Sequence, residues 1–367
     1  MINGVFSMYA LPPLRLLELS GSPRELGLRH GRALAPEIRV LRRALLTYLA
    51  RISLFAGAAP LYALLLFLAR RFWPQIPAPL QEEMQGVAAG AEVGLGTVLL
   101  LNVLDDLANN SPRCSALAAG GPYTGDGSYL LGRNLDYPLF TEVMVKYLTL
   151  FRLEPARGLP LASLAWPGYV GVCTGMNRAG VALAQLTTMS LDRSLKGIPA
   201  ALRFRRALEG GADVGTAASL ILQAPGTMGN NLLLCSAKEA AGLEISARTG
   251  VIRYPEAGLL LATNHYQSGP MAPLKGRFPP RPPFSPLSPH HFTAAYSRSR
   301  LARLEELTAE SRLGPERIQA ILADPGIANA GTVVSAVFAP SGQKMWVARG
   351  ARPPVNQGPF QEVRLWG

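Results

Sequence analysis

Apolar residues recur at helical spacing through residues 1–110, with polar residues between them. After Ser22 the chain reads PRELGLRHGRALAPEIRVLRRALLTYLA, in which apolar positions repeat every three or four residues. Ser22 and Pro23 fit an N-cap and a first-turn proline, so a helix is predicted to begin there. A second helix is expected from Pro79, and a third over 96–104.

Beyond Asn110 the pattern changes to short runs of β-branched and large apolar residues, which favour strands. Strands are expected at 129–131, 143–153, 161–166, 170–173, 181–186, 231–236, 243–246, 250–254 and 259–263. Helices are expected at 199–208, 213–222, 294–307 and 315–323, before three short closing strands. The proline-rich segment 268–293 is predicted to form a long exposed loop or lid. Strands, then helices, then strands again favour an α+β layered fold over alternating parallel units.

One long apolar run, residues 52–69, reads ISLFAGAAPLYALLLFLA and has arginines on both sides. It is just long enough for a transmembrane helix, although a glycine and a proline interrupt it. Two other interpretations stay open: a buried or broken pair of helices, and a helix that lies on a lipid surface with its arginines at the interface. The last of these predicts peripheral membrane contact through 52–72.

Composition limits the classes of protein to consider. Apolar residues make up 49% of the chain and charged residues 16%, a balance that supports a sizeable core and argues against a disordered chain. The 36 Lys and Arg residues exceed the 24 Asp and Glu residues, which gives a net charge of +12 and favours anionic partners. The sequence has no dense basic block interleaved with aromatic residues and no nucleic-acid-binding motif, so no nucleic-acid partner is predicted.

Three cysteines, Cys114, Cys173 and Cys235, lie far apart, and their odd number argues against a disulfide framework. The sequence contains no Cys-x-x-Cys pair, and neither a metal nor a cofactor is predicted. Cys173 and Cys235 lie in apolar runs and are expected to be inert core thiols. The first residues lack a basic segment followed by a long apolar one, so we expect a cytoplasmic protein, peripheral at a membrane if 52–72 binds lipid.

The candidate chemistry lies in residues 109–138, NNSPRCSALAAGGPYTGDGSYLLGRNLDYP. Cys114 stands where the helical pattern gives way to the first strand-like run. A hairpin that turns through 124–127 would bring Arg133 and Asp136 back beside Cys114. An arginine and an aspartate on one strand are, taken alone, more typical of a structural ion pair.

GRNLDYP, following a cysteine at this spacing, resembles the acid ceramidase and N-acylethanolamine acid amidase group. It is also similar to the wider choloylglycine hydrolase and penicillin acyltransferase relatives, which are N-terminal-nucleophile (Ntn) hydrolases. SGSPRELGLRHGRAL and residues 75–102 resemble the leader of the acyltransferase branch, and TGMNRAGVALA, residues 174–184, is similar to a GMN-x-x-G stretch of bile-salt hydrolases. GNNLLLCSA, ATNHY and SRLAR also have counterparts, and the order of these motifs carries the resemblance.

The resemblance implies an α+β fold of four αββα layers, with two antiparallel sheets stacked between helical layers. It also implies self-cleavage of the Arg113–Cys114 bond, which would leave a helical leader, 1–113, associated with a catalytic region, 114–367. Elementary chemistry fits, because cleavage frees an α-amine with a pKa of about 8 on the residue that carries the thiol. That amine can accept the thiol proton and replace a separate base.

Further roles follow from the resemblance. Arg133 would favour the thiolate, and Asp136 would hydrogen-bond and orient the α-amine. Arg300, the first arginine of SRLAR, would support the site electrostatically. The plain alternative for Arg300 is a solvated helix residue.

The oxyanion donors are also implied by the resemblance. The side-chain amide of Asn231 and a donor of Asn177 would bind the oxyanion, and Asn230 competes for the first role. The alternatives are a strand cap and a left-handed turn residue, respectively. Tyr137 and His265 are the candidate substrate contacts, and His265 is also a rival base for the cysteine.

The leading hypothesis is hydrolysis of a linear amide C–N bond in a small N-acyl substrate, through an acyl-thioester on Cys114. The apolar run 52–69 and the resemblance favour a lipid-like acyl chain. One alternative is acyl transfer to an amine acceptor, which passes through the same acyl-enzyme. Another is a non-catalytic, membrane-associated protein on the same scaffold.

Overall fold

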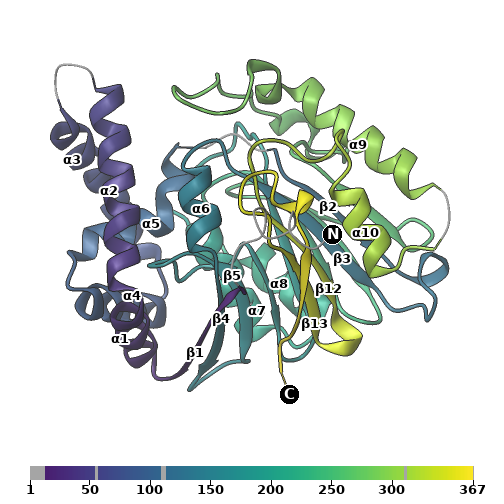
Figure 1. The fold of residues 1–367 in the computed structure, drawn as a ribbon, viewed down its shortest axis with the longest axis horizontal. Coiled ribbons are helices and arrows are strands. Elements are labelled where there is room, and N and C mark those ends of the chain that lie inside the picture. The colour runs from purple at the N-terminus through teal and green to yellow at the C-terminus, as the bar shows by residue number, and fades with distance from the viewer. Residues whose placement is uncertain (1–12, 54–56, 109–112, 310–311, 367) are drawn as a thin grey trace, which may run out of the picture.

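The computed structural model describes residues 13–53, 57–108, 113–309 and 312–366, which form two β-sheets with helices packed against them (Figure 1). The first sheet has the order β1 (Arg15–Gly21), β4 (Thr149–Pro155), β5 (Leu161–Ala165), β6 (Thr174–Asn177), β7 (Ala182–Thr187), β8 (Asn230–Cys235), β9 (Ala240–Ile245), β10 (Gly250–Arg253). The second has the order β11 (Leu259–Ala262), β2 (Ser115–Ala119), β3 (Leu130–Asp136), β12 (Thr332–Ala339), β13 (Lys344–Ala348), β14 (Phe360–Arg364). Neighbouring strands are antiparallel except β1 and β4, which are parallel.

Helices of the described ranges pack against both sheets (Figure 1). They are α1 (Pro23–Ala33), α2 (Ala35–Ile52), α3 (Ala58–Ala69), α4 (Ala78–Ala91), α5 (Leu95–Ala108), α6 (Thr141–Tyr147), α7 (Ala200–Gly210), α8 (Val214–Gln223), α9 (Ala294–Thr308) and α10 (Pro315–Leu322). One apolar cluster joins α1, α4, α5, α7 and α8 to the eight-stranded sheet, a second lies between the sheets, and a third joins α9 and α10 to the six-stranded sheet. Inner strands such as β2 and β8 are therefore buried along their whole length.

Local signals explain how the first helices begin and pack. The Ser22 side chain accepts from the Glu25 backbone N–H, and the Glu25 carboxylate accepts from the Ser22 backbone N–H, which makes a complete capping box at the start of α1. Helix α1 then crosses α4 at glycines on both helices. A Cβ added at Gly27 would lie 2.0 Å from the Glu83 carbonyl oxygen, and one at Gly31 would lie 2.3 Å from that of Val87. These backbones meet this closely because neither glycine carries a side chain.

The structure confirms the predicted hairpin, which brings the strand of Arg133 and Asp136 back beside the strand that follows Cys114. Strand β2 pairs antiparallel with β3, and Ala116 lies opposite Arg133. The expected strand 143–153 is only half right, because 143–147 belongs to α6 and 149–153 to β4, and the strand expected at 170–173 is wrong, because this segment precedes β6. In α6, Met144 and Val145 are buried, so packing overrides the β preference of these residues. Strand β1 was not predicted, while 268–293 is a loop with short 3₁₀ turns, as expected.

The apolar run 52–69 is divided between two helices. Helix α2 ends at Ile52 and α3 covers Ala58–Ala69, while residues 54–56 lie outside the described ranges. The interpretation as a broken pair of helices is therefore confirmed, but the pair is not fully buried, because Leu64 is 50% exposed and Phe67 is 55% exposed on α3. In the described part of the chain, no helix combines the length and apolar character needed to cross a bilayer.

Candidate functional site

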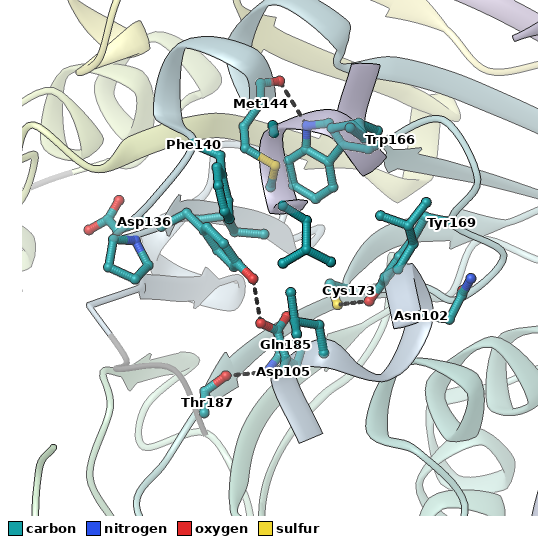
Figure 2. Close-up of a pocket in the computed structure, with 18 of the residues that line it drawn as sticks. Asn102, Asp105, Asp136, Phe140, Met144, Trp166, Tyr169, Cys173, Gln185 and Thr187 are labelled. Atoms are coloured by element: carbon teal, nitrogen blue, oxygen red, sulfur yellow. Dashed lines mark hydrogen bonds between the residues drawn. The ribbon is translucent and has the colours of Figure 1, made fainter. Parts of the chain in front are cut away.

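Cys114 borders a cavity of about 110 Å³ that α2, α5 and the loops after β3 and β5 enclose. Most of its wall is apolar, formed by Leu41, Ala44, Leu45, Leu101, Leu104, Leu135, Tyr137, Pro138, Phe140, Met144, Trp166, Pro167 and Tyr169. Polar groups come from Asn102, Asp105, Asp136, Cys173, Gln185 and Thr187. In Figure 2, Phe140, Met144 and Trp166 gather at one end of the cavity, and Asp105, Gln185 and Thr187 lie at the other. The cavity therefore has an apolar end and a polar end.

Arg133 lies beside Cys114 because β3 runs back along β2. Its guanidinium is fully buried, lies close to Cys114, and donates to the hydroxyl of Thr174. It also donates to the carbonyl oxygens of Cys173, at 3.2 Å, and Gln185, at 3.0 Å. Burial lowers the pKa of Arg133, and its negative neighbours oppose that effect. A buried cation whose hydrogen-bond acceptors are mostly neutral stabilises negative charge on an adjacent sulfur.

Asp136, at the end of β3, lines the same cavity as Cys114. Its Oδ2 accepts a hydrogen bond of 2.6 Å from the side-chain amide of Asn329, whereas Oδ1 is buried and has no hydrogen-bond partner among the described residues. Burial raises the pKa of Asp136 to about 6, and the Arg300 guanidinium, the Thr332 hydroxyl and the Asn329 amide act against that rise. One carboxylate oxygen is thus available to a donor that arrives at this position.

Arg300 joins α9 to the start of β2. It is fully buried, and its guanidinium donates to the Cys114 carbonyl oxygen and, at 2.8 Å, to the Ser115 hydroxyl. A third bond, of 2.9 Å, goes to the side-chain oxygen of Asn264. The alternative of a solvated helix arginine is therefore wrong, and the guanidinium fixes the backbone on the carboxyl side of Cys114.

Arg113, on the other side of the expected cleavage point, is also buried. Its guanidinium carbon lies 3.8 Å from the centre of the Phe292 ring. Burial lowers the pKa of Arg113 to about 10, and the charge of Asp136 opposes that effect. The Arg113–Cys114 peptide bond is therefore enclosed by the same charged groups as the thiol.

The two asparagines expected to bind the oxyanion are engaged elsewhere. The Asn231 side-chain amide donates to the carbonyl oxygens of Thr263, at 2.9 Å, and His265, at 2.8 Å. The Asn177 side-chain amide donates to the carbonyl oxygens of Leu208 and Gly211, and its backbone N–H donates to Val181. Neither asparagine lines the cavity. Donation by Asn231 to an oxyanion would require one of its two bonds to open, and Asn177 holds α7 to the sheet.

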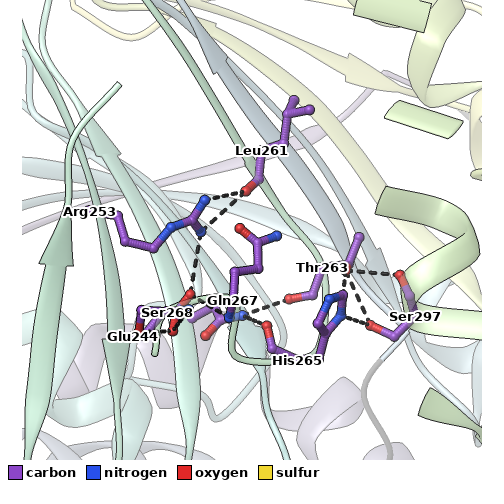
Figure 3. A network of polar contacts seen from close by, with 9 residues as sticks. Glu244, Arg253, Leu261, Thr263, His265, Gln267, Ser268 and Ser297 are labelled. Atoms are coloured by element: carbon purple, nitrogen blue, oxygen red, sulfur yellow. Dashed lines mark hydrogen bonds and ion pairs between the residues drawn. The ribbon is translucent and has the colours of Figure 1, made fainter. Parts of the chain in front are cut away.

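His265 is separated from the cavity. Its Nδ1 lies 3.1 Å from the Thr263 hydroxyl and 2.9 Å from the Ser297 hydroxyl (Figure 3). Burial lowers the pKa of His265 to about 4, and nearby arginines act in the same direction. Tyr137, the other expected substrate contact, does line the cavity and donates to Asp105 at 2.5 Å.

Sequence reasoning missed several residues of the site. Asn329 precedes β12, far from Asp136 in sequence, and no local pattern marks it. Cys173 was expected to be an inert core thiol, but it is only half-buried and lines the cavity. Burial raises the pKa of its thiol to about 12, so it is a poor nucleophile. Asp105 had a visible signal, because it is half of an acidic pair in an otherwise apolar helix.

The sequence model described as acyl-coenzyme A:6-aminopenicillanic acid acyl-transferase matches residues 123–353, well over half of the chain. The chain belongs to this acyl-transferase family. The resemblance expected from the sequence is thereby confirmed, and it puts the chain among the Ntn amidases and acyl-transferases.

Two curated relatives of this acyl-transferase family member match over part of their length. An uncharacterized protein of Archaeoglobus fulgidus is 26% identical over 231 residues, 56% of this chain and 38% of the relative. The acid ceramidase of Bos taurus is 25% identical over 134 residues, 33% of this chain and 32% of the relative. The chain thus spans about a third of the length of these relatives.

Three solved structures align with the acyl-transferase family chain at low identity. The Caenorhabditis elegans N-acylethanolamine-hydrolyzing acid amidase ortholog has 16% identity and a TM-score of 0.46, covering 62% of this chain and 93% of its own. A mutant of the conjugated bile acid hydrolase of Clostridium perfringens has 14% identity and a TM-score of 0.41, covering 68% and 96%. The penicillin V acylase of Agrobacterium tumefaciens has 14% identity and a TM-score of 0.42, covering 69% and 92%.

Proposed function

We propose that the chain is an amidase that cuts itself between Arg113 and Cys114 and then hydrolyses the linear C–N bond of an N-acyl compound. The observation that carries the proposal is the arrangement around Cys114. The sulfur borders an apolar cavity beside Arg133, and the unpartnered Oδ1 of Asp136 lines the same cavity. A new α-amine on Cys114 would supply the donor that this oxygen lacks.

The reaction follows from these groups. The α-amine takes the thiol proton, the thiolate attacks the amide carbonyl, and the leaving amine departs with that proton. The acyl-thioester on Cys114 is then hydrolysed by water, which the freed α-amine activates. Arg133 stabilises the thiolate, Asp136 orients the α-amine, and Arg300 holds the Cys114 carbonyl. Asn231 is the proposed oxyanion donor after one of its backbone bonds opens.

We infer a four-layer αββα Ntn architecture, cut into a leader, 1–113, and a catalytic region, 114–367. The pieces would remain associated, because β1 of the leader pairs with β4 along its whole length. Helices α2 and α5 of the leader also wall the cavity together with β3. An apolar cavity of this kind suits an aliphatic or aromatic acyl group, which supports a lipid-like substrate.

Mass analysis tests the maturation. The purified protein is expected to yield two fragments, the second beginning at Cys114, and Cys114→Ala is expected to stay uncut and to lose turnover of N-acyl amides by at least about 10³-fold. Cys173→Ala is the matched control and should be cut normally. A fully active protein with an intact Arg113–Cys114 bond would refute the mechanism.

Acyl transfer to an amine is the second candidate, because the matching family is named for an acyl-transferase. Both reactions share the acyl-thioester, and they differ only in whether water or an amine accepts the acyl group. Incubation with an N-acyl substrate and an added primary amine separates them. A new amide in excess of free acid favours the transferase, whereas free acid alone favours the hydrolase.

A further inference from the structure

A second hollow, which we call the α2 groove, has a volume of about 390 Å³. Its residues on α2 recur every three or four positions, which puts them on one stripe of the helix: Val40, Arg43, Ala44, Thr47, Tyr48 and Arg51. Leu139 and Phe140, before α6, and Phe284, in the proline-rich loop, complete the lining.

The α2 groove and the cavity that Cys114 borders share part of one wall, because Ala44 and Phe140 line both. In Figure 2, Phe140 lies at the apolar end of the cavity. Its ring meets the Tyr48 ring edge to face, with centroids 5.6 Å apart. The backbone of Phe140 has a φ of 56°, a left-handed conformation that bulky residues rarely adopt and that recurs at ligand sites. A molecule in the groove would touch the ring that also bounds the cavity.

The α2 groove carries positive charge. Arg43 and Arg51 are exposed on it, about 12 Å apart along the helix axis, and none of the described lining residues is acidic. Glu37, the acid of α2, pairs with Arg15 instead. The Arg51 guanidinium lies over the Phe284 ring, 4.8 Å from its centre, so it closes the far end of the groove. Arg43 is the cation next to the shared wall.

A cation beside an aromatic and aliphatic bed suits an anionic amphiphile. A guanidinium binds a carboxylate through charge-assisted hydrogen bonds, and an alkyl chain loses contact with water on the apolar bed. A cationic amphiphile would be repelled by the two arginines, and a small anion would leave the bed uncovered. The lining therefore favours one ligand class, a chain that ends in a carboxylate.

We propose that the α2 groove is a second binding site, which takes the free carboxylate form of an aliphatic acid. The carboxylate binds Arg43, and the chain lies on Tyr48, Phe140 and Phe284. Hydrolysis of an N-acyl amide releases an acid of this class, so its identification as the enzyme's own product rests on the proposed function. Because the bound acid touches Phe140, it is expected to weaken substrate binding in the cavity.

Calorimetric titration of the wild-type protein with octanoate, octanol, octylammonium and acetate tests the ligand class. Octanoate is expected to bind at least about tenfold more tightly than the other three, because it alone joins a negative charge to a chain. Equal binding of octanoate and octanol would leave the arginines without a role. Equal binding of octanoate and acetate would reduce the groove to a contact for small ions. Either result would overturn the proposal.

Arg43→Gln tests the position of the carboxylate and is expected to weaken octanoate binding by at least about tenfold. Arg42→Gln is the matched control, because Arg42 is exposed on α2 but does not line the groove, and it should change the affinity by less than about threefold. Unchanged affinity in Arg43→Gln would place the acid in the cavity beside Cys114 instead. Equal losses in both variants would show only an effect of net charge, and each of these results overturns the site.

Kinetics connect the groove with the proposed amidase. Octanoate is expected to raise the KM for an N-acyl amide without changing kcat, and Arg43→Gln should weaken this inhibition by at least about fivefold. Full inhibition of Arg43→Gln would show that the acid acts at the cavity alone, against the proposal. If no amide is turned over, the amidase function fails, whereas the titrations still decide whether the groove binds the acid.

Discussion

At the scale of single residues, the two oxygens of Asp136 have different surroundings. Oδ2 accepts from Asn329, while Oδ1 is buried without a partner in the described ranges. The amide of Asn329 also lies 3.3 Å from the Tyr296 hydroxyl, so it is held from two sides. Because a hydrogen bond to a carboxylate favours its charged form, Asn329 lowers the pKa of Asp136 together with Arg300 and Thr332, and so extends to lower pH the range in which Asp136 can hold an amine.

Asn329→Ala is expected to move the acid limb of kcat/KM to higher pH. Burial already raises the pKa of Asp136 to about 6, and loss of the Asn329 bond removes an influence that lowers it. A charge-assisted bond is worth about 1.5–3 kcal/mol, so the shift should be about one to two pH units. The measurement is the pH profile of amide hydrolysis. Tyr296→Phe should leave the limb in place, and an unchanged limb in Asn329→Ala would contradict the assignment.

Single residues also show how much of the candidate site can be predicted from the sequence. Cys114, Arg133 and Asp136 could be associated in advance, because they belong to one hairpin whose turn and strands have local signals. Asn329 could not, because only the pairing of β12 with β3 brings it there. The hydrogen bonds of Asn231 could not be predicted either, since its partners are backbone carbonyls of another segment.

At the scale of elements, the crossing of α1 over α4 depends on the absence of side chains. Added Cβ atoms at Gly31, Gly86 and Gly90 would each come within 2.4 Å of a backbone oxygen on the opposite helix. The contact carries part of the core that supports the eight-stranded sheet. Substitution here therefore forces whole helices apart, since no flexible side chain can move away.

Gly31→Ala is expected to lower the free energy of unfolding by about 1–3 kcal/mol, as overpacking of a core does. Its Cβ would lie 2.3 Å from the Val87 carbonyl oxygen and 2.7 Å from the Ala91 nitrogen. Urea denaturation at constant pH measures the change. Gly94→Ala is the control, because nothing lies within 4 Å of its added Cβ, and it should change stability by less than about 0.5 kcal/mol. Equal effects would show that the crossing tolerates separation.

Helices and strands were easier to predict than the elements with which they pack or pair. The helical period and the capping residues located α1, α4 and α5 to within a few residues. The run 143–147 was misread, because β-branched residues suit a strand locally and only burial of Met144 and Val145 makes them helical. Strand β1 was not predicted, because its short sequence forms a strand only by pairing with β4, a contact that the local pattern does not show.

At the scale of the whole molecule, we propose that α3 contacts a lipid surface. Leu64 and Phe67 are exposed on it, Arg70 and Arg71 are exposed directly after it, and Arg51 is exposed in the last turn of α2. An apolar face with cations beside it suits an anionic membrane. Helix α2, which precedes α3 in the chain, forms part of the wall of the apolar cavity. Contact of α3 with lipid would therefore bring a lipid-like substrate near the cavity.

The double variant Leu64→Ser/Phe67→Ser is expected to bind anionic vesicles at least about tenfold more weakly, because two large apolar side chains no longer enter the lipid. Co-sedimentation with phosphatidylserine-containing vesicles measures the binding, which should also weaken at high salt. Tyr254→Ser removes another exposed aromatic residue, 71% exposed, and should have no effect. Unchanged sedimentation of the double variant would exclude α3 as the contact.

The cavity wall contains residues from both sides of the Arg113–Cys114 bond. Leu41 and Asp105 belong to the earlier part, and Asp136 and the sulfur to the later one. Natural variation in the part before the Arg113–Cys114 bond can change which compound binds in the cavity without changing the reacting atoms. Chimaeras that join the first part of one homologue to the second part of another should accordingly have a substrate preference set by both parents, because Phe140, Met144 and Trp166 of the wall belong to the later part, and a reactivity set by the second parent alone.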